Sequence, residues 1–455
     1  MLRTLASDVE MRSTRGGGAR VRGRLQVFGR VPWSTAHRDS DASSNLRRQR
    51  DLAALHQSSV TSPVVGPRSR PVPSLRHGGP VISFVWSPGQ RLPAGTGGSE
   101  NYTVGQVREL NRRGIGARVV TIGLGTADGR AEFSDIPFHS VRHLDDVGRL
   151  DDTVVFVSEA PHITTRRPAY QILHVPPPLR AHQRAAVVDA TRDRILIATS
   201  KYAADLWASF LDVDVATVHV VHPFAEPAFG VEPRPAPTPG RRRVLYAGRL
   251  SPEKGIYTFL SMLHTDLIED DASLFFTVTT AGADKRQGRI IESMLRTHPR
   301  VDLVAARTTP AGMAALMAEH DVVVMPSNGQ YWHETFGIVS IEAQHTGARV
   351  VASDDGGLPE TQCGALQLVE ADNSEALALG IIDALSRDGA TPSERAIAAR
   401  CFTVGQSVDT LLEVLRAPQP ITPFRLVQEL EELISLPPHL PMHTRPSEDR
   451  SEAVL

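Results

Sequence analysis

The run Val81-Ile82-Ser83-Phe84-Val85-Trp86 is short and mainly apolar, which suits a strand buried inside a parallel sheet. A loop rich in glycine and proline follows it and ends at Gly95-Thr96-Gly97-Gly98. Ser99 is suited to cap the next helix, which has apolar residues at 104, 107 and 110 and ends at Gly114. Residues 117–122 form the next strand. This strand–helix–strand order predicts a right-handed crossover and a parallel sheet.

A second series of the same kind begins at Val244-Leu245-Tyr246-Ala247, where a strand leads into the loop Gly248-Arg249-Leu250. Ser251 is placed to cap the following helix, and Pro252 occupies its first turn, where proline is favoured. Further strands are expected at 153–157, 171–174, 195–199, 275–280, 301–304, 321–325 and 349–352. The two series predict an α/β fold with two Rossmann-like, doubly wound domains facing a central cleft. Ligands bind such sheets beyond the carboxyl ends of the strands.

The chain divides into five parts by composition. Residues 1–78 are rich in arginine and poor in acids, and we expect a disordered extension; a transit peptide, or a start codon assigned too far upstream, would fit the same bias. Residues 229–241 form a linker in which every second position from 233 to 239 is proline. The expected parts are 1–78, an N-terminal domain at 79–228, the linker at 229–241, a C-terminal domain with a closing helix at 242–417, and a final helix and tail at 418–455.

Composition narrows the class of protein. The 455 residues are 41% hydrophobic and 22% charged, with a net charge of −2, so nothing in the overall charge calls for nucleic acid. We find no run long and apolar enough for a transmembrane segment, although peripheral membrane contact stays open. The two cysteines, Cys363 and Cys401, fit a reducing cytoplasm and give no basis for a cysteine-rich metal site.

The segment from His333 to Glu342 carries the clearest functional pattern. Glu334 and Glu342 lie eight positions apart, and Phe336 and Gly337 come where a helix is expected to begin between them. The free backbone N–H groups of a helix start attract a diphosphate, and carboxylates on either side can accept bonds from hydroxyl groups. This layout therefore suits the two polar ends of a nucleotide sugar.

These motifs, taken in order, resemble the retaining GT-B glycosyltransferases of the family-4 type, the glycosyl transferases group 1. The resemblance covers roughly residues 80–417. The motifs that carry it are Gly97-Gly98-Ser99-Glu100, the run from Gly248 to Gly255, Met325-Pro326-Ser327, the Glu334–Glu342 pair, and Gly356-Gly357-Leu358-Pro359-Glu360.

The resemblance implies a role for each matching residue. Arg249 and Lys254 would hold the diphosphate of the donor and neutralise the leaving group, as two fixed cations can. Glu342 would bind the ribose, and Glu334 would face the transferred sugar. Further donor contacts would come from Gly97 and Gly98, and from the backbone of Phe336, Gly337 and Ile338. His174 would lie near the reacting carbon, with His162 as the rival candidate.

The implied reaction is the metal-independent, retaining transfer of a sugar from a nucleotide diphosphate sugar to an acceptor hydroxyl, without a cofactor. The donor would bind mainly to the C-terminal domain and the acceptor to the N-terminal one. The acceptor stays open between a glycan, a lipid and a small molecule, and the donor nucleotide is not specified. Asp212-Val213-Asp214 matches the DxD metal–nucleotide motif of another glycosyltransferase fold but lies away from the expected donor loops.

Three other classes stay open at this stage. A catalytically degenerate nucleotide-sugar-binding relative would keep the fold, but such proteins usually lose Arg249, Lys254 or one of the glutamates. An epimerase on the same scaffold is a second alternative. A phosphorylase would need a lysine for pyridoxal phosphate, and the lysines other than Lys254 are Lys201 and Lys285, neither with a cofactor signal nearby.

Overall fold

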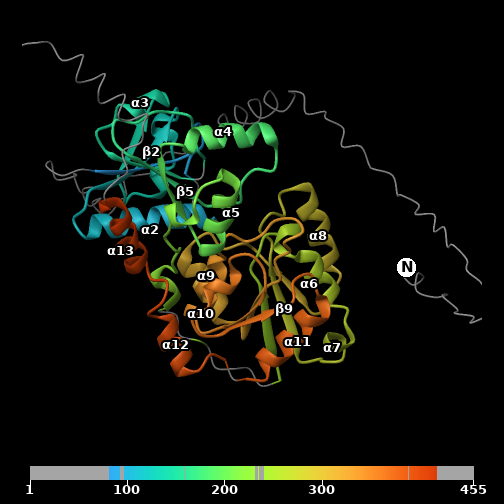
Figure 1. Cartoon of the computed structure of the whole chain (residues 1–455). Coiled ribbons are helices and arrows are strands. Elements are labelled where there is room, and N and C mark those ends of the chain that lie inside the picture. Colours follow the sequence, from blue (N-terminus) through green and yellow to red (C-terminus); the bar gives the residue numbers. More distant parts are fainter. Residues whose placement is uncertain are drawn as a thin grey trace, which may run out of the picture. The chain divides into compact units, whose positions relative to one another are not determined.

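The computed structural model describes residues 81–92, 97–157, 159–230, 234, 240–387 and 389–417. The expected extension at 1–78, the final helix and tail at 418–455, and most of the proline-rich linker lie outside these residues. Within them, the chain forms two parallel sheets, each with helices along the connections between its strands (Figure 1).

The first sheet has the strand order β3-β2-β1-β4-β5-β6-β7, and every neighbouring pair is parallel. Its strands are β1 (Ile82–Val85), β2 (Ala117–Ile122), β3 (Phe138–Val141), β4 (Thr153–Val157), β5 (Ala169–Leu173), β6 (Arg194–Ala198) and β7 (Val218–Val220). Its connections contain α2 (Gly98–Arg112), α3 (Asp145–Gly148), α4 (Ala181–Thr191) and α5 (Lys201–Leu211), with 3-10 turns η1 (Gly125–Ala127), η2 (Arg130–Glu132) and η3 (Val215–Thr217). The turn η4 (Pro227–Gly230) follows β7, and its Phe229 packs into a core of the second sheet.

The second sheet has the order β10-β9-β8-β11-β12-β13 and is also parallel throughout. Its strands are β8 (Arg242–Tyr246), β9 (Leu274–Thr279), β10 (Val301–Val304), β11 (Val322–Met325), β12 (Arg349–Ser353) and β13 (Leu366–Val369). Its helices are α6 (Ile256–Met262), α7 (Asp266–Glu269), α8 (Arg286–Arg296), α9 (Pro310–Ala318), α10 (Ile338–His345), α11 (Ser374–Leu385) and α12 (Pro392–Ala398), with turns η5 (Pro252–Lys254) and η6 (Leu358–Thr361).

Both sheets are buried on their two faces, as the continuous apolar strands predict. In β1, Phe84 packs into one core and Val85 into another, because successive side chains of a strand point to opposite faces. In β8, Val244 and Leu245 likewise pack into two different cores. No helix among the described residues is both long and apolar enough to cross a bilayer.

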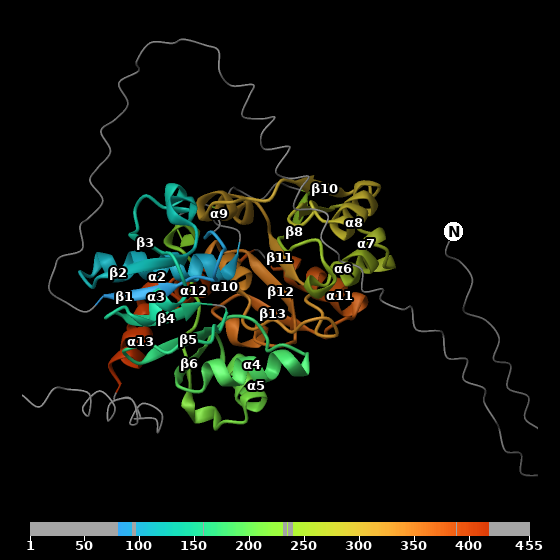
Figure 2. The same ribbon diagram turned by 90° about the horizontal axis from the view of Figure 1, so that it is seen from above.

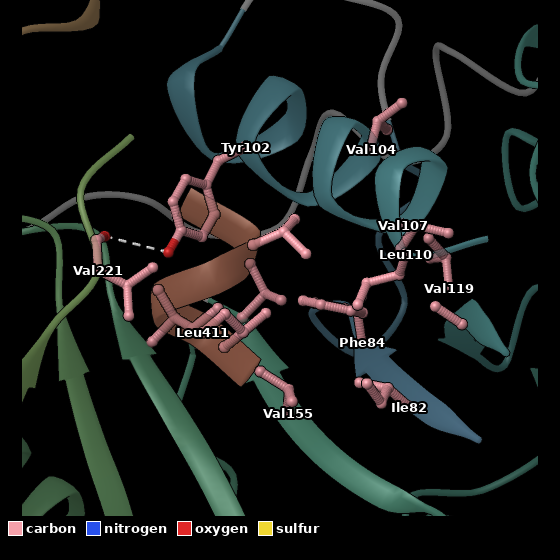
Figure 3. Packing of buried hydrophobic residues seen from close by; sticks show 14 of the residues in the cluster. Ile82, Phe84, Tyr102, Val104, Val107, Leu110, Val119, Val155, Val221 and Leu411 are labelled. Carbon is pink, nitrogen blue, oxygen red and sulfur yellow. Dashed lines mark hydrogen bonds between the residues drawn. The ribbon is translucent and has the colours of Figure 1, made fainter. Parts of the chain in front are cut away.

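The last described helix, α13 (Val404–Arg416), differs from the expectation that residues 242–417 form one domain. Its apolar face packs on α2 and on the first sheet, where Leu411 lies among Phe84, Val107 and Leu110 (Figure 3). Both overall views place α13 beside α2 (Figures 1 and 2). The chain therefore returns to the first domain after completing the second, because the core around α2 takes up the apolar face of α13.

Two helix starts also differ from expectation. Helix α2 begins at Gly98 with Gly97 as its N-cap, so Ser99 lies inside the helix and its carbonyl accepts a bond from the Thr103 hydroxyl at 2.8 Å. The helix expected from Ser251 is interrupted, because Gly255 has a positive φ of 68° that ends the short turn η5 before α6 begins.

Candidate functional site

The second sheet brings two loops together. Strands β8 and β11 are neighbours, and the connections that leave them reverse direction at this point of the strand order. Loops at the carboxyl ends of such a pair form the usual ligand site of an open α/β sheet. One of these loops carries Arg249 and Lys254, and the other carries Glu334 and Gly337.

Lys254 and Glu334 form an ion pair across these two loops. Glu334 is 9% exposed, and the Ser327 hydroxyl donates a bond of 3.1 Å to the same carboxylate oxygen. Gly255 makes the close approach feasible, because a Cβ at this position would lie 1.5 Å from the carbonyl oxygen of Pro326. The sequence motifs predicted both charges, and the structure places them in direct contact.

Tyr246 fixes the loop that carries the two cations. Its buried hydroxyl lies 2.9 Å from the carbonyl oxygen of Arg249 and 3.0 Å from that of Lys254. The Arg249 side chain is more than half exposed and contacts Glu253 at 3.3 Å, so its guanidinium stays accessible to a ligand. The loop thus presents one exposed cation, Arg249, and one partly buried cation, Lys254, from a fixed backbone.

The turn at Gly97 and Gly98 meets the same site from the first domain. A Cβ on Gly98 would lie 3.0 Å from the end of the Ile338 side chain, so this turn touches the start of α10. Burial raises the pKa of Glu100 above its usual value, while the charge of Arg249 acts in the opposite direction. The structure therefore brings together Gly98, Arg249 and Ile338, which the sequence predicted as donor contacts.

Helix α10 begins with an open N-terminus. Its N-cap Gly337 has a φ of 103° and provides no side-chain cap. Among the described residues, no acceptor is bonded to the backbone N–H groups of Phe336, Gly337 and Ile338. The Phe336 ring is buried against His222 and Phe402, so only its backbone faces the site. Three free N–H groups and the helix dipole make this a place for an anion.

Glu342 lies one turn into α10 and is 7% exposed. Within the described part of the chain, its carboxylate makes no hydrogen bond or ion pair. Burial, with the nearby charge of Glu226, raises the pKa of Glu342 to about 8. Burying a carboxyl group without a hydrogen-bond partner costs free energy. Such an unpartnered group is expected where hydroxyl groups of a ligand bind.

The two candidate histidines have different surroundings. His174 follows β5, is 9% exposed, and contacts the Tyr102 ring edge-on at 4.9 Å. Its carbonyl accepts a bond of 2.7 Å from Thr335, next to Glu334, and its Nε2 has no partner among the described residues. Burial lowers the pKa of His174 to about 3, so the ring is neutral. His162 is exposed and pairs with Asp189 at 2.7 Å, so the catalytic role stays a prediction for His174.

Other polar motifs have local structural roles. Asp212 ends α5 in the left-handed conformation, and Asp214 caps the turn η3 by accepting a bond from Ala216 N at 2.9 Å. Arg184 donates to the carbonyl of Phe210 at 2.8 Å and lies over its ring. The DxD match is therefore a pair of caps on consecutive turns.

Sequence reasoning assigned no role to three polar residues that hold the site together. They are Ser327, which bonds Glu334, and the pair Ser200 and Thr335, whose contact joins the two domains. Ser200 and Thr335 are 135 positions apart in the chain. No local pattern in a single sequence marks such a contact.

Comparison with known proteins agrees with this geometry. Residues 241–387 match the family model described as glycosyl transferases group 1. The D-inositol 3-phosphate glycosyltransferase of Streptomyces griseus is 30% identical over 219 residues, 40% of this chain and 43% of the relative. The enzyme of the same name from Mycolicibacterium gilvum is 30% identical over 261 residues, 52% and 54% of the two chains. The chain thus spans about half the length of these relatives.

Solved structures identify the fold as GT-B. A glycosyltransferase from Rickettsia africae superposes with a TM-score of 0.59 at 14% identity, covering 74% of this chain and 98% of that one. Anabaena Alr3699/HepE, solved in complex with UDP and glucose, gives a TM-score of 0.58 at 19% identity, with 74% and 99% covered. The expected fold of two Rossmann-like domains is confirmed.

Proposed function

We propose that this protein transfers a sugar from a nucleotide diphosphate sugar to an acceptor hydroxyl. The observation that carries the proposal is the convergence of Lys254, Glu334 and the open start of α10 at the carboxyl ends of β8 and β11. The family of residues 241–387 and the names of the relatives support the same activity.

The donor would lie along α10. Its diphosphate would accept bonds from the free N–H groups at Gly337 and Ile338 and meet the positive charges of Arg249 and Lys254. Its ribose would bind the carboxyl group of Glu342, which lacks a partner among the described residues. The transferred sugar would then reach Glu334, on the far side of the diphosphate from the ribose.

We propose a metal-independent reaction with retention of configuration. As the bond between sugar and diphosphate breaks, negative charge develops on the leaving oxygens, where two cations and a helix start supply positive charge in advance. Glu334 is already held by Lys254 and Ser327, so its carboxylate is better placed to stabilise positive charge on the sugar than to attack it. The acceptor would attack on the face that the diphosphate leaves, and a diphosphate oxygen would take its proton.

Two features argue against the alternatives. A degenerate binding protein would not need Lys254 and Glu334 to be paired beside the open helix start, since a nucleotide can be held by the helix alone. An epimerase would need a free acid or base on each face of the sugar, whereas the carboxylate of Glu334 is held by Lys254 and Ser327. We place the reaction in the cytoplasm, where the two free cysteines would stay reduced.

The test is sugar transfer itself. Purified protein is incubated with UDP-, GDP- and ADP-glucose and with inositol phosphate, glucan or glycolipid acceptors, and the anomeric proton of each product is followed by NMR. We expect one nucleotide sugar to be consumed and its anomeric configuration to be kept. A product with the opposite configuration would contradict the retaining mechanism, and donor use without any acceptor product would contradict transfer.

A further inference from the structure

Glu360 reaches from one domain to the other. It lies on the turn η6, and its carboxylate accepts the backbone N–H of Lys201 at 2.8 Å and of Tyr202 at 2.7 Å. These N–H groups open helix α5 of the first domain, whose N-cap is Ser200. A carboxylate at a helix start satisfies free N–H groups and lies favourably in the helix dipole. Two of the free N–H groups at the start of this helix are therefore satisfied by a residue of the other domain.

The charge state of Glu360 fits this contact. Burial raises the pKa of its carboxyl group, but bonds from His222, Tyr202 and Lys201 outweigh burial, and the pKa lies below its usual range. His222, at 3.5 Å from the carboxylate, also comes from the first domain. Glu360 is therefore a carboxylate at neutral pH and can accept both bonds.

The segment that leads to Glu360 also contacts the main chain of Glu334. The backbone N–H of Gly357 donates a bond of 2.7 Å to the carbonyl of Glu334, and a Cβ on Gly356 would lie 2.4 Å from the same oxygen. The main chain of Glu334 is thus fixed against the segment that ends in Glu360. No side chain could be added at Gly356 without moving Glu334.

Thr335 completes the connection on the other side. Its carbonyl accepts a bond from the Ser200 hydroxyl, and its own hydroxyl donates a bond of 2.7 Å to the carbonyl of His174. The segment with Glu334 is therefore held between η6 on one side and the first domain on the other. We name the contacts of Glu360 with Lys201 and Tyr202, of Ser200 with Thr335, and of Thr335 with His174 the interdomain clamp.

We propose that Glu360 is a positioning residue for sugar transfer: through the interdomain clamp it fixes the place of Glu334 relative to His174. This inference rests on the proposed function, in which Glu334 faces the reacting sugar. Glu360 touches neither the expected diphosphate site nor the ribose site. It acts on the distance between two groups contributed by different domains, and displacements of about 1 Å between such groups cost up to roughly 100-fold in rate.

We expect substitutions of Glu360 to lower turnover while leaving donor binding nearly unchanged. Glu360→Ala removes both bonds to α5, and Glu360→Gln keeps one acceptor oxygen but opposes the second N–H with an amide donor. We expect kcat to fall on the order of tenfold in Glu360→Ala and less in Glu360→Gln, while the KM for the donor changes less than about twofold. Hydrogen exchange at the amides of Lys201 and Tyr202 should speed up in the same order.

Glu394→Gln is the matched control. Glu394 also accepts a backbone N–H at a helix start, from Thr391 at 2.6 Å, but this capping box lies within α12 and its N-cap. The substitution makes the same chemical change without touching the interdomain clamp. Its kcat and the exchange at residues 201 and 202 should equal those of the wild type.

Three outcomes decide the question. If Glu360→Ala and Glu394→Gln have the same kcat, Glu360 does not position the site. If Glu360→Ala loses cooperative unfolding, and loses binding of whichever of UDP, GDP and ADP the wild type binds, along with turnover, its role is general stability and the assignment is overturned. If the wild type itself transfers no sugar, the proposed function fails, and amide exchange then reports on the interdomain clamp alone.

Discussion

Lys254→Ala is expected to lower kcat/KM for sugar transfer by about 2–4 kcal/mol of transition-state stabilisation, the scale of removing one preorganised electrostatic group. Lys254 pairs with the buried Glu334 and lies beside the expected diphosphate, so its loss removes charge from the leaving group and leaves Glu334 without its cation. Arg249→Ala should lose an amount in the same range, through the leaving group alone. Steady-state kinetics with a saturating acceptor measures both.

Arg387→Ala is the control for this prediction. Arg387 is exposed and pairs with Asp383 of α11, and among the described residues it has no contact with Lys254 or Glu334. We expect its kinetics and its thermal unfolding to match the wild type. Lys254→Ala should unfold at a lower temperature, because it leaves the largely buried carboxylate of Glu334 without its cation. Near-normal turnover in Lys254→Ala would show that the donor site has been assigned to the wrong loop.

Glu342→Gln is expected to make stability less dependent on pH. Burial raises the pKa of Glu342 to about 8 in the folded protein, against 4.5 for a free glutamate side chain, so the folded state holds a proton that the unfolded state releases. Between these values the folded state binds more protons, and the free energy of unfolding falls as pH rises. Each pKa unit corresponds to about 1.4 kcal/mol, so the total loss is on the order of a few kcal/mol.

A glutamine at 342 cannot ionise, so this loss should disappear. Urea unfolding at pH 5 and pH 9 should show the variant gaining several kcal/mol over the wild type at the higher pH. Glu394→Gln is a control in which the pH dependence of stability should change in the opposite sense. Hydrogen bonds and Arg349 outweigh burial and keep the pKa of Glu394 below its usual value. Equal pH dependence in wild type and Glu342→Gln would mean that Glu342 is ionised in the folded protein.

The sequence predicted the central strands well, because they are continuous apolar runs. The expected strand at 153–157 coincides with β4, and the parallel order of both sheets follows from the alternation of strands and helices. Strands β3, β7 and β13 were not expected. They lie at sheet edges and are only partly buried, so their sequences lack the apolar run that marks a central strand.

The candidate site, too, could be predicted only in part from the sequence. Arg249, Lys254 and Glu334 follow motifs with local spacing, and the structure brings them together. The return of α13 to the first domain and the bond between Thr335 and His174 depend on pairings far apart in sequence. Such contacts follow from how the two domains meet, and a single chain carries no periodic signal for them.

Thermal unfolding with added nucleotides tests whether the loops that carry Lys254 and Glu334 bind the donor. Wild type and Lys254→Ala are heated with UDP, GDP, ADP and their glucose conjugates, with and without EDTA. A ligand at 100 times its Kd adds about 2.7 kcal/mol to the free energy of unfolding. We expect one nucleotide to stabilise the wild type regardless of EDTA and to stabilise Lys254→Ala less. A folded wild-type protein that no nucleotide stabilises, or one stabilised only when metal is present, would contradict it.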